Sequence, residues 1–263
     1  MADNPVSLPG NKNVLFTNRQ LVTLMWPLLL EQMLAIAVGL ADSLMVATVG
    51  DAAISAVSLV DSISNLMIYI FSAMATGGAA VAGQYIGLKQ KEDACNAGQQ
   101  LIALLAVVSV SFAALLYLFR PQILTTMFGH IEPDVMDATN TYYLYVMASI
   151  PGIALYNGGA ALFRTMGRSD VSLKVSLPMN GINVTGNAIL IFGVGMDVAG
   201  VAIPTLISRT VAAAVILALL FNKKLMLHLS DARRRWWRMP SATRSATSTA
   251  LPVKPSTSAL RQW

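Results

Sequence analysis

The chain has 263 residues, of which 55% are hydrophobic and only 12% are charged, and its mean hydropathy is +0.60. A soluble globular domain usually carries about 25% charged residues, so this composition leaves too little polar surface to cover a water-soluble fold of this size. The net charge of +5 does not indicate a nucleic-acid partner, because the basic residues gather in short loops and at the ends. The composition predicts an integral membrane protein, with the lipid bilayer as its surroundings.

Six stretches of the chain are long and apolar enough to cross the hydrocarbon core, which takes about 20 mainly apolar residues in a helix. No alternating pattern typical of a β-barrel accompanies them, so the predicted fold class is all-α with six transmembrane helices. The expected spans are residues 21–48, 54–86, 94–118, 141–163, 171–192 and 199–221. The expected domains are a cytoplasmic segment (1–19), a six-helix transmembrane lobe (20–222) and a basic cytoplasmic tail (223–263).

The distribution of Lys and Arg among the loops predicts the orientation, because cytoplasmic loops are enriched in both. One set of loops holds Lys12, Arg19, Lys89, Lys91, Arg164, Arg168, Lys174, Lys223 and Lys224. The opposite set holds Asp51, Arg120, Glu132, Asp134, Asp137 and Asp197. The two sets alternate correctly with six spans, so we expect both termini in the cytoplasm and the chain in a plasma membrane, such as a bacterial inner membrane.

The tail at 223–263 is rich in Ser, Thr, Pro and Arg, and it contains the run RRRWWR at 233–238. Such a composition buries too little apolar surface to fold. We expect it to be disordered, or to be sequence read in a shifted frame, and the basic aromatic run could rest on anionic headgroups.

Ionisable residues inside a membrane are costly and are candidates for function. Glu31 and Asp42 both lie in the first expected span, and their spacing of eleven residues places them on one face, three turns apart. Asp42 is flanked by apolar residues and is too short to reach the interface. Glu31 could also be hydrated near the inner surface.

Two later spans place polar groups at a depth similar to that of Asp42. Asn183 and Asn187 lie one turn apart in the fifth span, and Thr205 and Arg209 lie one turn apart in the sixth. The asparagines could equally join helices by hydrogen bonds, and Arg209 could neutralise a nearby acid.

Nothing in the sequence indicates an enzyme or a resident cofactor. It contains no GxxxxGK[ST] phosphate-binding loop. The two histidines, His130 and His228, fall on opposite sides of the membrane in the predicted topology, and with the single Cys95 they cannot form a usual zinc site.

Five segments of the chain resemble the multidrug and toxic compound extrusion (MATE) family, and together they cover roughly residues 15–225. The segments are PLLLEQMLAIAVGLADSLMV (27–46), ATGGAAVAGQYIG (75–87), RTMGRS (164–169), NVTGNAILIFG (183–193) and GVAIPTLIS (200–208). The resemblance implies twelve helices in two six-helix lobes, of which this chain matches the amino-terminal lobe.

The resemblance also implies a secondary transporter that exchanges drugs or other small organic compounds for H⁺ or Na⁺. In the family an acidic residue of the first helix carries coupling, which matches Asp42, with Glu31 as a second candidate and a sodium ion near Asp42 as an alternative to a proton. Asn183, Asn187 and Thr205 match supporting positions, with Arg209 nearby. Many members carry Asp where this chain has Asn187.

Three functions stay open on the sequence alone. The first is drug–cation antiport, for which this lobe would need a second six-helix lobe or a homodimer. The second is a flippase of lipid-linked precursors from the same superfamily. The third is a membrane fragment that does not transport and only associates with partner helices.

Overall fold

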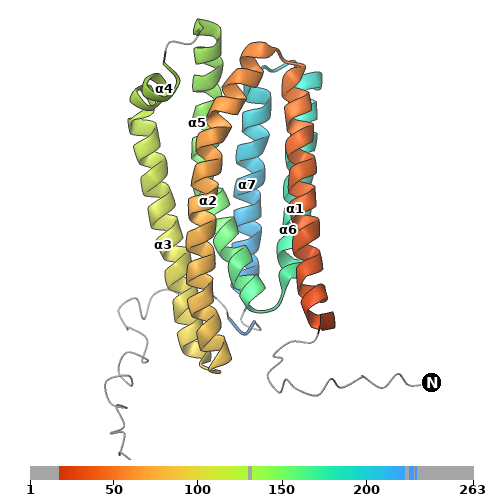
Figure 1. Ribbon diagram of the computed structural model, residues 1–263, viewed down its shortest axis with the longest axis vertical. Coiled ribbons are helices and arrows are strands. Elements are labelled where there is room, and N and C mark those ends of the chain that lie inside the picture. Colours follow the sequence, from red (N-terminus) through yellow and green to blue (C-terminus); the bar gives the residue numbers. More distant parts are fainter. Residues whose placement is uncertain (1–17, 130–131, 223–224, 228, 230–263) are drawn as a thin grey trace, which may run out of the picture.

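The computed structural model describes residues 18–129, 132–222, 225–227 and 229, and it is a bundle of six long helices with one short one (Figure 1). The long helices are α1 (Asn18–Ala47), α2 (Asp51–Gly87), α3 (Lys91–Leu118), α5 (Pro133–Thr165), α6 (Ser169–Ala188) with the π-helical turn η1 (Ile189–Gly193), and α7 (Ala199–Leu220). All six are long and apolar enough to cross a membrane. The predicted all-α fold with six spans is confirmed.

Two features of the chain between α3 and α5 were not predicted. A short helix, α4 (Arg120–Phe128), begins with Pro121 in its first turn. Helix α5 begins at Pro133, eight residues before the predicted start of that span, again with Pro and Asp134 in the first turn. Proline and acidic residues both favour a helix start, so these polar residues begin helices where the hydropathy pattern showed only a loop.

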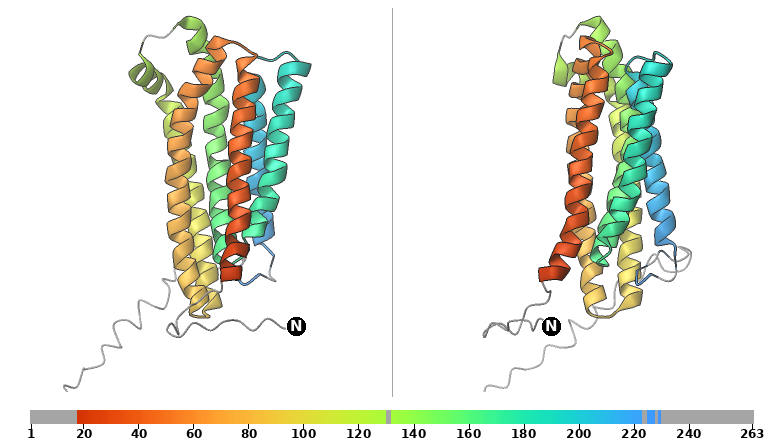
Figure 2. Two further views of the ribbon diagram at one scale, coloured as in Figure 1. Left: turned by 45° about the vertical axis from the view of Figure 1, so that its right-hand side comes forward. Right: turned by 90° about the vertical axis from the view of Figure 1, so that its right-hand side faces the viewer.

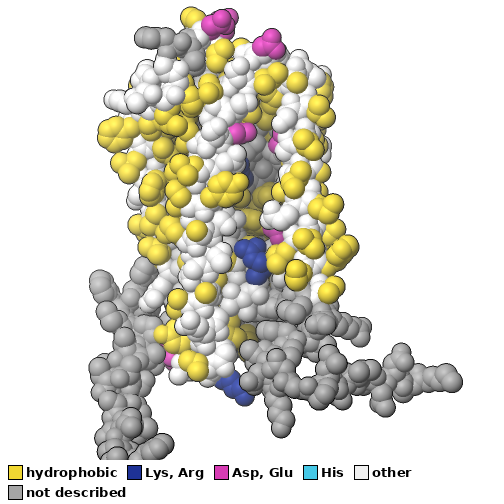
Figure 3. All heavy atoms as spheres, in the orientation of Figure 1, with side chains coloured by type: hydrophobic (Ala, Val, Ile, Leu, Met, Phe, Trp, Pro, Cys, Tyr) yellow, Lys and Arg dark blue, Asp and Glu magenta, His cyan; other side chains and the backbone are white. Residues whose placement is uncertain are grey.

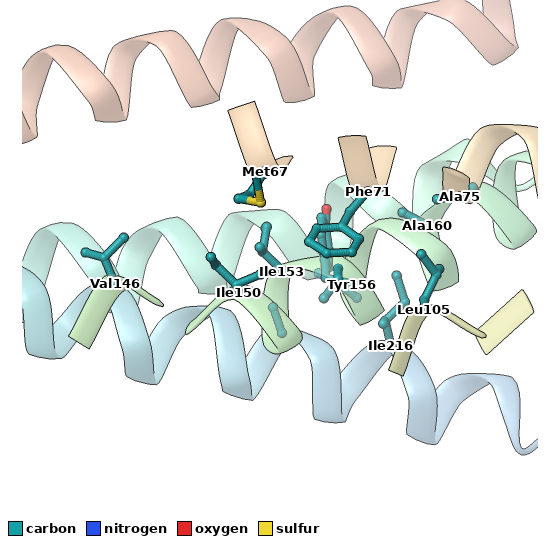
Figure 4. Close-up of a cluster of buried hydrophobic side chains, with 14 of the residues drawn as sticks. Met67, Phe71, Ala75, Leu105, Val146, Ile150, Ile153, Tyr156, Ala160 and Ile216 are labelled. Carbon is teal, nitrogen blue, oxygen red and sulfur yellow. The ribbon is translucent and has the colours of Figure 1, made fainter. Parts of the chain in front are cut away.

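Helix α5 is the central helix of the bundle. It packs along α2, α3 and α7, while α1 packs mainly on α6 and makes few contacts with α2 (Figures 1 and 2). Its apolar side chains form the core together with side chains from α2, α3 and α7 (Figure 4). The aromatic pair Phe71–Phe112 adds an edge-to-face contact between α2 and α3, with 6.1 Å between ring centroids.

Close helix approach depends on small residues at several crossings. A Cβ at Gly83 of α2 would lie 2.7 Å from Thr165 Cγ2, and one at Gly152 of α5 would lie 3.1 Å from the backbone oxygen of Arg209 in α7. Such positions let two helices approach backbone to backbone. They let α5 approach α7 at Gly152 and α2 at Gly83.

The two predicted loop sets lie at opposite ends of the bundle. Asp51, Asp134, Asp137 and Asp197 line one pocket of about 700 Å³ at the end where α1 finishes. The loops with Lys89, Arg164 and Arg168 lie at the end where α1 begins. The structure therefore agrees with the alternation of the loops, while the side of the membrane that each end faces remains a prediction.

Most of the two predicted terminal segments lies outside the described residues, including residues 233–238. The described part of the predicted tail packs on the bundle: Leu227 is fully buried, and a Cβ at Gly98 of α3 would lie 2.8 Å from its Cδ2. The Leu229 N–H also donates to the Leu220 carbonyl at 2.9 Å. The described residues 225–227 and 229 thus lie against the six-helix lobe.

Candidate functional site

Asp42 is a half-buried carboxylate on the last two turns of α1. It lies five residues before the end of the helix, which corresponds to about 8 Å of helix length. Its neighbours along the helix are mainly apolar. A carboxylate in such surroundings must find hydrogen-bond donors within the protein, and these come from α6.

Asn187 provides the first donor. Its Nδ2 donates to Asp42 Oδ1 at 2.8 Å, joining α6 to α1, and its side chain is completely buried. The other atom of this amide, Oδ1, is also buried and has no hydrogen-bond partner among the described residues. The predicted association of Asp42 with Asn187 is therefore present, and it leaves one oxygen available beside the carboxylate.

Asn183 lies one turn earlier on α6, between Asp42 and Thr205. When its amide nitrogen faces Thr205, the Nδ2–Oγ1 distance is 3.0 Å, and the amide oxygen then faces the carboxylate. Exchanging the two amide atoms lets the N–H₂ donate to Asp42 Oδ2 at 3.1 Å and Oδ1 at 3.2 Å, and lets Thr205 donate to the amide oxygen at 3.0 Å. We adopt this second arrangement because it satisfies both groups.

The local fold of α6 brings these amides into place. A Cβ at Gly186 would lie 2.8 Å from Pro204 Cβ, so only glycine allows α6 and α7 to approach this closely. The helix then widens into the π-helical turn η1 directly after Ala188. Such turns occur frequently at functional sites, and this one follows Asn187 by two residues.

A second carboxylate, Asp61 of α2, lies close to this cluster and was missed in the sequence analysis. The buried Tyr142 of α5 donates its hydroxyl to Asp61 Oδ1 at 3.2 Å. The available signal was a single ionisable residue in the interior of a membrane-spanning stretch. The hydroxyl of Tyr142 gave no signal, because tyrosine is common in membrane helices.

Arg209 of α7 forms no direct salt bridge to Asp42 or Asp61. Its Nη1 donates to Ser149 Oγ of α5 at 2.8 Å. Within the described residues the single ion pair is Lys174–Asp170, at 2.8 Å on the surface of α6. The described side-chain partner of Arg209 is thus a neutral hydroxyl, and its predicted role in neutralising an acid stays a prediction.

Glu31 belongs to a different cluster. Tyr156 of α5 donates to Glu31 Oε1 at 2.8 Å, and Ser172 of α6 donates to Oε2 at 2.8 Å. Eleven residues of helix separate Glu31 from Asp42, which is about 16 Å along α1. The structure thus places the two predicted acids in two separate polar clusters that share one helix.

The space-filling view shows acidic and basic side chains within a hollow between α1 and α2 (Figure 3). Around it, the lobe presents mainly apolar side chains, as expected for contact with lipid. Five spans contribute polar groups to the cluster around Asp42 and Asp61: α1, α2, α5, α6 and α7. Among the described residues no group of three or more His, Cys, Asp or Glu side chains could hold a metal ion.

The oxygen atoms around Asp42 suit a small hard cation. They are the carboxylate, the unpartnered Oδ1 of Asn187, and the hydroxyl of Thr205. Oxygen donors of this kind bind hard cations, and a carboxylate also accepts a proton. These groups have the chemistry to accept either a proton or a small hard cation.

A family model described as MatE matches residues 27–189 of the chain. The chain is 30% identical over 215 residues to the uncharacterized transporter YisQ of Bacillus subtilis, covering 80% of this chain and 46% of that protein. It is 21% identical over 210 residues to the probable multidrug resistance protein NorM of Thermotoga maritima, covering 78% and 45%. The chain thus spans about half the length of the curated relatives that it matches.

The chain also spans about half the length of the solved structures that it matches. An outward-facing multidrug resistance transporter of the MOP superfamily matches with a TM-score of 0.76 and 21% identity, covering 81% of this chain and 47% of that one. A MOP superfamily transporter from Pyrococcus furiosus, described as having a binding pocket of reverse polarity, matches with the same TM-score, identity and coverage. The six-helix fold corresponds to one half of these transporters.

Proposed function

This chain belongs to the MatE family of membrane transporters, and on that basis we propose that it is one lobe of a secondary transporter that exchanges a small organic compound for H⁺ or Na⁺. The observation that carries the proposal is the environment of Asp42. Its half-buried carboxylate is held by amides of α6, next to a buried amide oxygen of Asn187 that has no partner in the described structure. Such a carboxylate can bind and release a cation.

In this proposal, hydrogen bonds between helices couple cation binding at Asp42 to the conformation of the lobe. Asp42 on α1 is joined to α6 through Asn187 and Asn183, and through Asn183 to Thr205 of α7. Binding of a cation to the carboxylate removes its negative charge and weakens its demand for N–H donors. The packing of α1 against α6 and α7 is then more stable in one conformation when the cation is bound and in another when it is absent. Binding of the cation therefore shifts the population between these two conformations.

A second lobe or a second copy of the chain completes the transporter in this proposal. Polar groups in the hollow between α1 and α2 would be costly to expose to lipid, so they need a protein surface opposite them. Alternating access also requires two halves that move against each other around a shared site. One lobe by itself supplies only half of that arrangement.

The charge of the cluster supports an exporter of neutral or cationic compounds rather than a flippase of anionic lipid-linked precursors. Asp42 and Asp61 outnumber Arg209, and the pocket at the end of the bundle is lined by Asp51, Asp134, Asp137 and Asp197. An anionic headgroup would be repelled by both.

Transport in proteoliposomes tests the proposal. We would compare the chain alone with the chain joined in tandem to the carboxy-terminal half of the Bacillus subtilis relative. Efflux of ethidium would be followed under an imposed proton or sodium gradient. We expect gradient-driven efflux from the tandem protein and none from the chain alone as a demonstrated monomer. Efflux by the monomer would contradict the proposal. So would efflux by the tandem protein that depends on neither the proton gradient nor the sodium gradient.

A further inference from the structure

The Glu31 carboxylate joins three helices of the lobe. Tyr156 of α5 donates to its Oε1 at 2.8 Å, and Ser172 of α6 donates to its Oε2 at 2.8 Å. Both donors are buried, whereas Glu31 itself is half-buried. Among the described residues none forms a salt bridge with Glu31. The charge of the carboxylate is therefore held by hydrogen bonds from two neutral hydroxyls.

Each of these hydroxyls has a second acceptor on the backbone of α6. The Tyr156 hydroxyl oxygen lies 3.3 Å from the carbonyl oxygen of Ser172, and Ser172 Oγ lies 3.0 Å from the carbonyl oxygen of Ser169. A hydroxyl carries one hydrogen, and it can also accept hydrogen bonds through its lone pairs. Each hydroxyl can therefore donate either to Glu31 or to a carbonyl of α6.

This arrangement satisfies Glu31 in both of its protonation states. When the carboxylate is ionised, both hydroxyls donate to it, one to each oxygen. When it is protonated, its own O–H can donate to Tyr156 or Ser172, while both hydroxyls turn to the carbonyls of α6. These carbonyls already lie within hydrogen-bond distance. The site can thus gain or lose a proton without leaving a buried polar group unsatisfied, which would be costly.

The cluster lies close to one end of the lobe. Helices α1 and α6 begin at this end (Figure 1). Ser172 follows the first residue of α6 by three positions, which corresponds to about 5 Å of helix length. Asp42, in contrast, lies about 8 Å from the opposite end of α1. The two acids of α1 are therefore close to opposite ends of the bundle.

The helices around Glu31 bring few other charges to it. On α6, Asp170 and Lys174 form an exposed ion pair with each other at 2.8 Å. On α5, Arg164 lies in the last turn. Helix α2 makes few contacts with α1, and its titratable group nearest the depth of Glu31 is the exposed phenol of Tyr69. Protonation of Glu31 therefore depends mainly on its two hydroxyl donors.

We propose that Glu31, Tyr156 and Ser172 form a second proton-binding site of the lobe, which exchanges protons at the end where α1 begins and independently of Asp42. The proton comes from the aqueous phase and returns to it. Uptake replaces two hydrogen bonds to an anionic carboxylate by one neutral hydrogen bond from Glu31, so it loosens the hold of α5 and α6 on this part of α1. The proposal goes beyond the cation exchange at Asp42, which lies about 16 Å away along α1.

Infrared difference spectroscopy on the full chain in lipid nanodiscs tests this proposal with protons as the probe. The chain contains three glutamates, so Glu92→Gln combined with Glu132→Gln leaves Glu31 as the single one. Labelling glutamate with ¹³C then identifies the C=O band of protonated Glu31. We expect this band to appear on acidification and to be missing in Glu31→Gln. A band that is absent, or present, over the whole pH range in which the lobe stays folded overturns the proposal.

Variants of the two donors test whether the hydroxyls hold the ionised form. Tyr156→Phe and Ser172→Ala should each raise the midpoint of the titration by about one to two pH units, because each removes a hydrogen bond to the charged carboxylate. Either variant decides the question if the other does not fold. Tyr143→Phe is the matched control on α5, since this buried tyrosine donates to the Leu116 carbonyl at 2.9 Å. Unchanged midpoints in the folded donor variants, or an equal change in the control, would contradict the proposal.

Asp42→Asn separates this site from the proposed function. The Glu31 band should keep its midpoint in this variant, since the two acids share no hydrogen-bond partner. A midpoint that moves by about one pH unit or more would refute the independence of the two sites. If Asp42→Asn abolishes efflux by the tandem protein but Glu31 never titrates, this inference fails and the proposed function stands. If Glu31 titrates as expected but Asp42→Asn transports normally, only the proposed function fails.

Discussion

Asn187 Nδ2 lies 2.8 Å from Asp42 Oδ1, and this hydrogen bond joins two residues that are 145 positions apart in the chain. It connects α1, which has few contacts with α2, to α6, which packs on the rest of the lobe through α7. The bond therefore ties the position of α1 to the charge on Asp42.

Asn187→Leu should destabilise the lobe by about 1–3 kcal/mol when Asp42 is ionised, because the carboxylate loses an N–H donor in a buried setting. The loss should shrink in acidic buffer, since a neutral carboxyl needs that donor less. Thermal unfolding of the wild type and the variant in detergent, measured across a pH series, checks the prediction. A difference in stability that does not change with pH would show that the amide only fills space.

Gly186→Ala should also destabilise the lobe, by about 1–3 kcal/mol, because the added methyl group overpacks a tight contact. Its Cβ would lie 2.8 Å from Cβ of Pro204, whose ring cannot move aside. Gly181→Ala is the matched control on the same helix, since nothing lies within 4 Å of a Cβ there. Unfolding temperatures of the two variants should differ clearly. Equal temperatures would mean that α6 and α7 are not held this closely.

Glu31→Gln and Asp42→Asn should have additive effects on stability. The two acids are about 16 Å apart along α1 and share no hydrogen-bond partner, and distant sites usually add within about 0.5 kcal/mol. A double-mutant cycle by thermal or denaturant unfolding measures the interaction energy. A larger coupling energy would mean that a movement of α1 links the two clusters, so that Glu31 and Asp42 respond together.

Cysteines introduced at exposed loop positions should determine the orientation. Asp51→Cys and Asp197→Cys should react with an impermeant thiol reagent added outside intact cells, whereas Arg168→Cys should react only after the membrane is opened. The native Cys95 is buried, and a Cys95→Ser background removes its signal. The reverse labelling pattern would invert the topology predicted from the basic loops.

The sequence supported correct predictions about the fold because hydropathy reports directly on transfer into the bilayer. All six spans were predicted, and every end agrees within three residues except the start of α5, when η1 is counted with α6. The start of α5 at Pro133 was missed, because its first turns are polar and extend beyond the apolar window. Asp42, Asn183, Asn187 and Thr205 do come together, since their depths could be compared from the loop alternation.

Other parts of the site depend on how each helix is rotated about its axis and packed against its neighbours. The depth of a residue in the membrane does not determine either. Glu31 and Asp42 share a face of α1, yet Glu31 meets Tyr156 and Ser172 rather than the amides of α6 that hold Asp42. Asp61 was not predicted, because this acid in the interior of α2 lies outside the five segments that resemble the family. Its hydrogen bond with Tyr142 depends on the packing of α5 against α2, which the sequence does not specify.

The central claim is that Asp42 carries the exchange of the coupling cation, and ethidium efflux by the tandem two-lobe protein tests it most directly. Asp42→Asn resembles the neutral form of the carboxyl, so it should abolish efflux driven by a proton or sodium gradient while expression and membrane insertion persist. Asp42→Glu keeps the carboxylate and should retain part of the activity. If Asp42→Asn transports ethidium with an unchanged dependence on pH and sodium, Asp42 is not the coupling residue.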